Sequence, residues 1–268
     1  MDLQLSDRVI VITGASKGIG LAATRTFLEE GARVVAVSRK SSEELEGLSS
    51  AALVHVAADL TDPDAAEQAV ARAVEAFGGV DVLVNNAGGP PAGVSLPRFS
   101  FLGPDDEEWR AILEFNLLTA VRASRSAIPV MLERGGGAIV NLSTGNARQP
   151  GPMNAHYAAA KAAVSNLTMT LSEEFSPQGI RVNTVSPGPV RTSWWTEEGG
   201  AADVIAGQVG SDRDSVLDTL APQMMNLTTG RLVDPQEVAD AIVLLASPRS
   251  ASTTGSDYVV DGGLLKSV

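Results

Sequence analysis

The sequence RVIVITGASKGIGLAATRTFLEEG, residues 8–31, joins three local patterns. Residues 8–13 are a β-branched apolar run, residues 13–20 contain three glycines, and residues 20–31 have a helical pattern. A strand that is apolar on both faces is typical of a parallel sheet covered by helices on both sides. A strand, a glycine turn and a helix in this order therefore predict the first unit of an α/β fold.

The same alternation continues along the chain. Further apolar runs occupy residues 33–38, 53–58, 80–85, 137–143, 181–186 and 257–261. Helical patterns follow the first run at 20–31 and occur again at 62–78, at about 105–133 and at about 153–176. In the pattern at 62–78, Asp62 or Asp64 can cap the start, and Gly78 follows the end. We predict an α/β, single-domain doubly wound (Rossmann) fold over residues 1–268, with a seven-stranded parallel sheet flanked by helices.

Composition narrows the possible functions. The 268 residues are 44% hydrophobic, carry a formal charge of -12, and include two histidines and no cysteine. Disulfides, thiolate metal sites and cysteine nucleophiles are excluded, and we expect no bound metal. Nucleic-acid binding requires clustered Lys and Arg, so we expect no nucleic-acid partner. With no run of 18 apolar residues, we expect no membrane span and a cytoplasmic protein.

The glycine turn predicts a dinucleotide site. Gly14, Gly18 and Gly20 have the spacing G-x-x-x-G-x-G, which differs from the commonest fingerprint, G-x-G-x-x-G. Both spacings allow a tight turn and place a pyrophosphate at a helix N-terminus, where backbone N–H groups point outward. A glycine-rich turn without a ligand is the alternative, and the flanking strand and helix argue against it.

The end of the second strand favours NADP(H) over NAD(H). Sites for NAD usually place an acidic residue there, whereas this chain has Ser38, Arg39 and Lys40. Arginine can pair with a 2′-phosphate in a fork, and Lys17 in the glycine turn is a second cation nearby. Alternatively, Arg39 and Lys40 are solvated surface residues.

Tyr157 and Lys161 lie four residues apart in an alanine-rich helical pattern, so they share one face. A tyrosine pKa near 10 makes a poor base at neutral pH. An ammonium at about 5 Å would contribute about 3 kcal/mol toward lowering that pKa, which would make Tyr157 a proton donor and acceptor. The pair alone is weak evidence, because such neighbours usually lie on a surface.

Taken together, the motifs closely resemble the short-chain dehydrogenase/reductase family, in its main branch of roughly 250 residues. In chain order they are TGASKGIG (13–20), Asp59, NNAG (85–88), Asn116, the Ser143/Thr144 pair, YAAAK (157–161), SPGPVRT (186–192) and the C-terminal 234–263. The resemblance implies binding of NAD(H) or NADP(H), hydride transfer between alcohols and carbonyls, and a homo-oligomer, tetramer or dimer.

The resemblance also implies residue roles. Tyr157 is the general acid/base, Lys161 lowers its pKa and holds the nicotinamide ribose, and Asn116 anchors a water that relays protons to Lys161. The expected cofactor-binding residues are Gly14, Ser16, Lys17, Gly18, Ile19, Gly20, Ser38, Arg39, Asp59, Leu60, Asn86, Ala87, Gly88, Tyr157, Lys161, Pro187, Gly188, Val190 and Thr192.

Two departures from the family pattern matter. The loop from Gly88 to Trp109 looks several residues longer than usual. The family's catalytic serine lies 13 residues before the tyrosine, which is Thr144 here, whereas Ser143 lies 14 before. Successive strand residues point to opposite faces, so we predict Thr144 as the working hydroxyl. A bulge in the turn TGNARQPGP (144–152) would instead bring in Ser143.

Residues 190–232 form a predicted substrate-loop segment. Its Trp194, Trp195, Met224 and Met225 suggest an apolar pocket, although such residues are more often core. The leading prediction is an NADP(H)-dependent oxidoreductase for a small carbonyl or alcohol. The alternatives are an epimerase or dehydratase, a non-catalytic cofactor sensor, or a 3-oxoacyl-thioester reductase. A carrier-protein substrate would need a basic rim, for which Arg98, Arg148, Arg191 and Arg231 are candidates.

Overall fold

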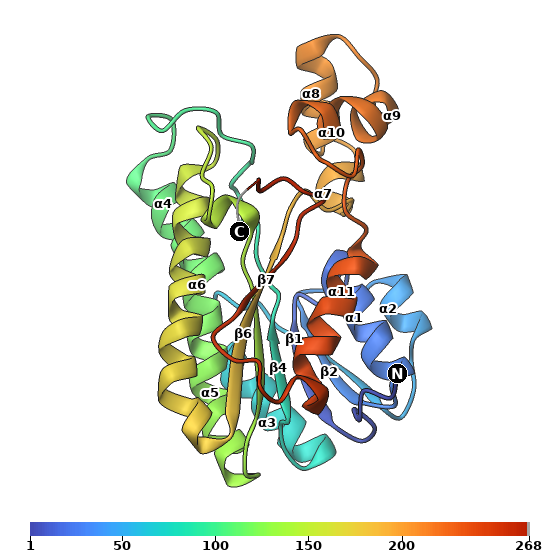
Figure 1. Ribbon diagram of the computed structural model, residues 1–268, viewed down its shortest axis with the longest axis vertical. Coiled ribbons are helices and arrows are strands. Elements are labelled where there is room, and N and C mark those ends of the chain that lie inside the picture. The colour runs from blue at the N-terminus through green and yellow to red at the C-terminus, as the bar shows by residue number, and fades with distance from the viewer. Residues whose placement is uncertain (267–268) are drawn as a thin grey trace.

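The computed structural model describes residues 1–266 and forms a single Rossmann-like domain (Figure 1). The last two residues of the predicted domain lie outside the described residues. The strands are β1 (Val9–Thr13), β2 (Arg33–Ser38), β3 (Leu53–Ala57), β4 (Val82–Asn85), β5 (Gly137–Leu142), β6 (Ile180–Pro187) and β7 (Asp257–Val260). The main helices are α1 (Gly18–Glu29), α2 (Glu43–Gly47), α3 (Ala65–Phe77), α4 (Asp106–Leu113), α5 (Thr119–Glu133), α6 (Ala155–Phe175) and α11 (Pro235–Ala246).

The seven strands form one parallel sheet, as predicted, and their order is β3-β2-β1-β4-β5-β6-β7. Strand β1 shows why its sequence is apolar throughout. Ile10 and Ile12 pack on one side of the sheet with Phe27 of α1, while Val9 and Val11 pack on the other side with helix α3. Both faces of the sheet are therefore buried.

The helices lie in two layers. Helices α1 and α11 cover one face of the sheet, and α3, α5 and α6 cover the other (Figure 1). Gly78 ends α3 in the left-handed conformation, as predicted. The capping prediction at the start of α3 is wrong: Asp64 is the N-cap residue but its side chain caps no N–H, and the Asp62 carboxylate accepts from Asp64 N.

The predicted helix at 105–133 is one helical stretch with an irregular centre. A π-helical turn, Glu114–Leu118, separates α4 from α5 and contains the buried Asn116. Such turns widen the helix locally and are common at functional sites. The sequence did not reveal it, because no residue type in EFNLL (114–118) distinguishes a π-helical turn from an α-helical one.

Residues Ser193–Leu227 form a small helical lobe beyond the carboxyl end of β6, seen in orange at the top of Figure 1. It contains α7 (Ser193–Thr196), α8 (Ala201–Val209), α9 (Arg213–Ser215) and α10 (Ala221–Met224). Its core holds Trp195 and several alanines, together with Leu217 and Leu227. Trp195 is therefore lobe core, and Met224 is exposed at 65%. The expected pocket wall of Trp and Met side chains is not formed by these two.

Within residues 1–266, no helix combines the length and the apolar character that crossing a bilayer requires.

Candidate active site

The glycine turn lies where the chain direction across the sheet reverses, between β1 and β4. Open α/β sheets bind ligands at this switch point, outside the carboxyl ends of the strands. Asn86 follows β4, and its amide nitrogen donates to Thr13 O at 2.9 Å and Gly14 O at 3.1 Å. A Cβ on Gly20 would lie 2.2 Å from Gly14 O, so only glycine fits there. The turn therefore depends on a close contact between backbone atoms, which a side chain at position 20 would prevent.

The segment after β6 covers this turn. Thr192 lies against Gly18, with its methyl carbon 3.1 Å from the position a Gly18 Cβ would take, and Val190 is buried. Lys17 reaches out from the turn to Glu197, which follows α7, at 3.1 Å. The glycine turn, the segment after β6 and the lobe therefore meet at one edge of the sheet. The predicted second cation for a 2′-phosphate is engaged with a carboxylate in the protein alone.

The end of β2 presents Arg39 to solvent, while Ser38 is buried. Ser38 Oγ donates to Lys40 O at 2.9 Å and contacts His55 Nε2 at 2.9 Å, so His55 is the hydrogen donor to Ser38. Nearby, hydrogen bonds from the backbone and side chain of Thr61, with a smaller contribution from Arg39, lower the pKa of Asp59. Leu60, expected beside adenine, directs its side chain into the core.

Tyr157 and Lys161 both lie on α6, one helical turn apart. Lys161 is buried, and its Nζ donates to Leu142 O at the end of β5 at 2.7 Å. Burial raises the pKa of Tyr157 to about 12 and lowers the pKa of Lys161 to about 8. The expected lowering of the tyrosine pKa by Lys161 is thus not found in the protein alone, because desolvation dominates both groups.

Gly88, Asn116 and Lys161 converge beside this pair. A Cβ on Gly88 would lie 2.8 Å from Lys161 Nζ and 3.0 Å from Asn116 Oδ1. The Asn116 amide clamps the neighbouring Gly89, accepting from its N at 2.8 Å and donating to its O at 2.9 Å. Its amide also donates to Ile112 O at 3.1 Å. The structure therefore places the predicted asparagine and lysine against the same loop.

The two adjacent hydroxyls differ in their surroundings. Ser143 Oγ is buried, donates to Lys161 O at 3.0 Å and accepts from Ser165 Oγ at 2.8 Å, so it is committed to α6. Thr144 is partly exposed and caps a short turn, accepting from Asn146 N at 3.4 Å. In the part of the chain that the structure describes, its O–H has no protein acceptor. Of these two hydroxyls, Thr144 is therefore the one with a donor available to a ligand.

The chain is similar to known proteins over almost its whole length. A family model described as Enoyl-(Acyl carrier protein) reductase matches residues 14–265. L-Rhamnose 1-dehydrogenase (NAD(P)(+)) of Azotobacter vinelandii is 36% identical over 97% of both chains. The 3-oxoacyl-acyl-carrier-protein reductase of Vibrio cholerae is 33% identical, covering 98% of this chain and 99% of its own. L-sorbose reductase from Gluconobacter frateurii, solved with NADPH and L-sorbose, has a TM-score of 0.88 and 34% identity over the whole of both chains.

The chain belongs to the short-chain dehydrogenase/reductase family. It is an oxidoreductase acting on CH–OH groups, in a family that uses NAD(P)(H).

One set of residues in this short-chain dehydrogenase/reductase was missed from the sequence. His156, immediately before Tyr157, is fully buried and contacts Glu108 Oε1 through Nε2 at 3.0 Å. Arg98 forms a fork with the same carboxylate, at 2.9 and 2.8 Å. Arg98 and Glu108 are 10 positions apart, and His156 lies 48 positions after Glu108. No local spacing connects them, and the only signal was a histidine beside the expected tyrosine.

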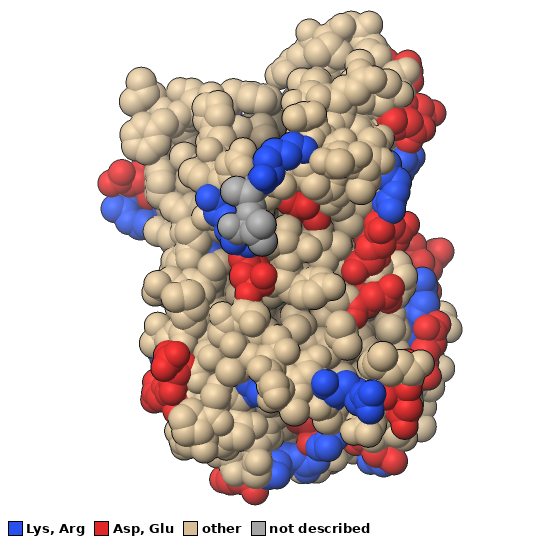
Figure 2. Space-filling view, in the orientation of Figure 1, with Lys and Arg blue, Asp and Glu red and all other residues tan. Residues whose placement is uncertain are grey.

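The arginines considered as a basic rim are all paired. Arg98 contacts Glu108, Arg148 lies 3.9 Å from Asp257, Arg191 contacts Asp218 and Arg231 contacts Glu237. On the face shown in Figure 2, basic and acidic side chains are interspersed, without a continuous basic field. An acidic carrier protein would therefore meet neutralised arginines.

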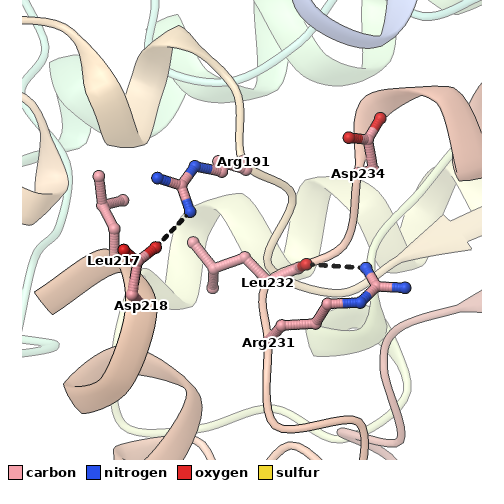
Figure 3. Close-up of a pocket in the computed structure, with 6 residues that line it drawn as sticks. All are labelled: Arg191, Leu217, Asp218, Arg231, Leu232 and Asp234. Atoms are coloured by element: carbon pink, nitrogen blue, oxygen red, sulfur yellow. Dashed lines mark hydrogen bonds and ion pairs between the residues drawn. The ribbon is translucent and has the colours of Figure 1, made fainter. Parts of the chain in front are cut away.

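A pocket of about 260 Å³ lies at the neck between the sheet and the lobe (Figure 3). Arg191 Nη1 pairs with Asp218 at 2.5 Å, and Arg231 Nη1 donates to Leu232 O at 3.2 Å. The neck itself is a parallel bridge between Val190 and Val233. The pocket contains none of the residues discussed as catalytic, and its charges are balanced internally. We therefore do not assign it to the reaction.

Proposed function

We propose that this protein is an NADP(H)-dependent oxidoreductase that interconverts a carbonyl and a secondary alcohol, with Tyr157 as the general acid/base. The observation that carries the proposal is the convergence of Lys161, Asn116 and Gly88 near the switch point of the sheet, with Tyr157 one helical turn before Lys161 on α6. Burying a lysine is costly, and buried ionisable groups beside a cofactor turn are typical of active sites.

The residues present fit the cofactor. Gly14 and Gly18 have positive φ values of 69° and 57°, and the backbone they form opens at the N-terminus of α1, where N–H groups can receive a pyrophosphate. Arg39 is exposed at the end of β2, where a 2′-phosphate would lie. When bound, the nicotinamide supplies or accepts the hydride. The remaining expected contacts from Ser16, Ile19, Ala87, Pro187 and Gly188 belong to the same proposal.

The protonation states suit reduction. With a pKa of about 12, Tyr157 is protonated at neutral pH and can donate its proton to a carbonyl oxygen. Lys161, with a pKa of about 8, is then largely cationic and stabilises the phenolate left behind. Asn116 would hold the water that returns a proton through Lys161. Thr144, whose O–H is available, would hydrogen-bond the substrate oxygen as negative charge develops.

We infer a small, uncharged substrate with hydroxyl groups in preference to a carrier-bound thioester. The paired state of Arg98, Arg148, Arg191 and Arg231 supports this choice, because no free cation remains among them to guide an acidic carrier. The relatives named for L-sorbose and L-rhamnose act on such compounds. In this proposal the lobe Ser193–Leu227 forms one wall of the substrate site. A homo-oligomer and a cytoplasmic location stay predictions.

The test is net oxidation of NADPH by a panel of ketoses, simple ketones and a 3-oxoacyl thioester. We expect turnover of a ketose, with NADPH preferred over NADH by about tenfold to 150-fold, since one charge-assisted contact contributes about 1.5–3 kcal/mol. Changing Ser38→Asp together with Arg39→Ala should reverse the preference, whereas Lys40→Ala serves as the matched control.

Equal kcat/KM for both cofactors would refute the NADP(H) assignment. Consumption of substrate without net NADPH oxidation would instead favour an epimerase or dehydratase, and binding of NADPH without any turnover would favour a sensor.

A further inference from the structure

The first turn of α6 lacks its ordinary cap. Helix N-cap side chains usually accept from the N–H two or three residues later. Asn154 occupies the N-cap position with a φ of 57°, and its side chain accepts no hydrogen bond from an N–H of the helix. Its Oδ1 instead accepts from Arg98 N at 2.7 Å, and its own N donates to Arg98 O at 2.8 Å. The long loop after Gly88 is thereby attached to the helix three residues before Tyr157.

His156 supplies the acceptor that the N-cap does not. The backbone N–H of Tyr157 donates to His156 Nδ1 at 2.9 Å. Because Nδ1 accepts, the ring proton lies on Nε2, which donates to Glu108 Oε1 at 3.0 Å. The two partners fix both the tautomer and the ring orientation. The ring is also held by Trp109, edge-on with centroids 5.6 Å apart.

Arg98 connects these two sets of contacts, because its side chain binds Glu108 and its backbone binds Asn154. Its guanidinium forks onto Glu108 at 2.9 and 2.8 Å, and hydrogen bonding from Arg98 is the main reason that the pKa of Glu108 falls to about 2. Glu108 is thus a carboxylate that orients His156 from one side and is fixed by Arg98 from the other. Since the Arg98 backbone holds Asn154, the loop contacts the start of α6 at two points.

We propose that Arg98, Glu108 and His156 are positioning residues for Tyr157. Together they hold the first turn of α6 so that the phenol of Tyr157 meets the substrate oxygen in reactive geometry. They act through the backbone of the tyrosine. The inference rests on the proposed function of Tyr157. In this proposal the extended loop between Gly88 and Trp109 supports the start of α6 through the contacts of Arg98.

The test measures kcat, KM for cofactor and substrate, and thermal unfolding in paired variants. Glu108→Ala and Arg98→Met should each lower kcat about tenfold or more, since small misplacements of reacting groups are costly. KM for NADPH should change less than twofold, because most of the expected cofactor contacts lie at the glycine turn and at the ends of β2, β4 and β6. Glu108→Gln keeps an acceptor for His156 and should recover much of the lost kcat. The double variant Arg98→Met/Glu108→Ala should be no worse than Glu108→Ala alone, since both act through one path.

The matched control is the exposed pair on the same helix, Asp106 and Arg110. Asp106→Ala and Arg110→Met each remove this exposed ion pair from α4 and should leave kcat within twofold. His156→Leu extends the series if it folds. Unchanged kcat in folded Glu108→Ala and Arg98→Met would overturn the inference. So would equal losses in Glu108→Ala and Glu108→Gln that follow the unfolding temperature, because these indicate a structural role only.

Tyr157→Phe, measured in parallel, separates this inference from the proposed function. If Tyr157→Phe keeps its turnover, the role of Tyr157 fails and the positioning role fails with it. If Tyr157→Phe is inactive while Glu108→Ala and Arg98→Met are normal, only the positioning inference fails.

Discussion

The sheet edge that carries the glycine turn and the lobe Ser193–Leu227 face each other but are built differently. At the sheet edge, Asn86 and the glycines hold the chain through buried hydrogen bonds and close backbone contacts. The lobe instead has a small core rich in alanine, with exposed or half-exposed ion pairs such as Arg191–Asp218 and Arg213–Asp203. Exposed pairs contribute little to stability, so we expect the lobe to open more readily than the sheet edge. We therefore expect the catalytic steps to depend on residues of the sheet edge, and conformational change to take place in the lobe.

The largest effect should come from Tyr157→Phe, on the sheet side. The change keeps the ring and removes the proton donor, so kcat should fall by at least about a hundredfold, within the 10²–10⁴ range of general acid/base catalysis. NADPH affinity, measured by fluorescence titration, should stay within about threefold.

The chain contains one other tyrosine, Tyr258 on β7, which is 47% exposed. Tyr258→Phe is the matched control and should leave kcat unchanged. A Tyr157→Phe enzyme that retains more than a tenth of the wild-type kcat would show that the chemistry does not depend on this residue.

The two hydroxyls after β5 give the next largest effect. Thr144→Val keeps the shape of the side chain and removes its donor, so kcat should fall by about tenfold to a hundredfold while unfolding changes little. Ser143→Ala removes two hydrogen bonds to α6, so it should lower the free energy of unfolding by about 1 kcal/mol and change kcat less than threefold. The reverse pattern, with kcat lost in Ser143→Ala and kept in Thr144→Val, would assign catalysis to Ser143.

Substituting one glycine in each region compares how tightly the two regions are packed. Gly20→Ala would place a methyl group 2.2 Å from Gly14 O, so we expect the free energy of unfolding to fall by about 1–3 kcal/mol or more. Gly207 lies inside α8 of the lobe, where an added methyl group would meet no described atom within 4 Å apart from its chain neighbours and the nearby helix backbone, and Gly207→Ala should raise stability by about 0.5–1 kcal/mol. Urea unfolding of both variants measures this. Similar changes at the two positions would contradict the difference between the regions.

The sheet side could be predicted because its signals are local. Strands β1 to β7 are short apolar runs, and the glycines near Gly14 follow directly from the turn they must form. Tyr157 and Lys161 share a helix, so their spacing alone predicts their common face. Even the difference between Ser143 and Thr144 follows from the alternation of side chains along a strand.

The lobe and the surroundings of Tyr157 could not be predicted in the same way. The lobe core includes several alanines, such as Ala202 and Ala206, which give little contrast between buried and exposed faces. The link from Arg98 through Glu108 to His156 depends on tertiary packing, with Glu108 and His156 48 positions apart in the chain. The pKa of Tyr157 was predicted in the wrong direction, because a sequence shows the neighbouring charge of Lys161 but not the burial of both groups.

The smallest predicted effect lies at a salt bridge that joins the two regions at the cofactor turn, Lys17–Glu197 at 3.1 Å. Both side chains are well exposed, at 65% and 60%, so the pair contributes about 0–1 kcal/mol. In the proposed NADP(H) complex, Glu197 competes with the 2′-phosphate for Lys17. Glu197→Gln should therefore tighten NADPH binding by about twofold to fivefold, leave NADH binding unchanged, and lose its effect at high salt. Glu198→Gln is the adjacent control. If Glu197→Gln changed both cofactor affinities equally, the bridge would act on the position of the lobe and not on the phosphate, and the lobe would be more firmly attached to the sheet than its exposed charges indicate.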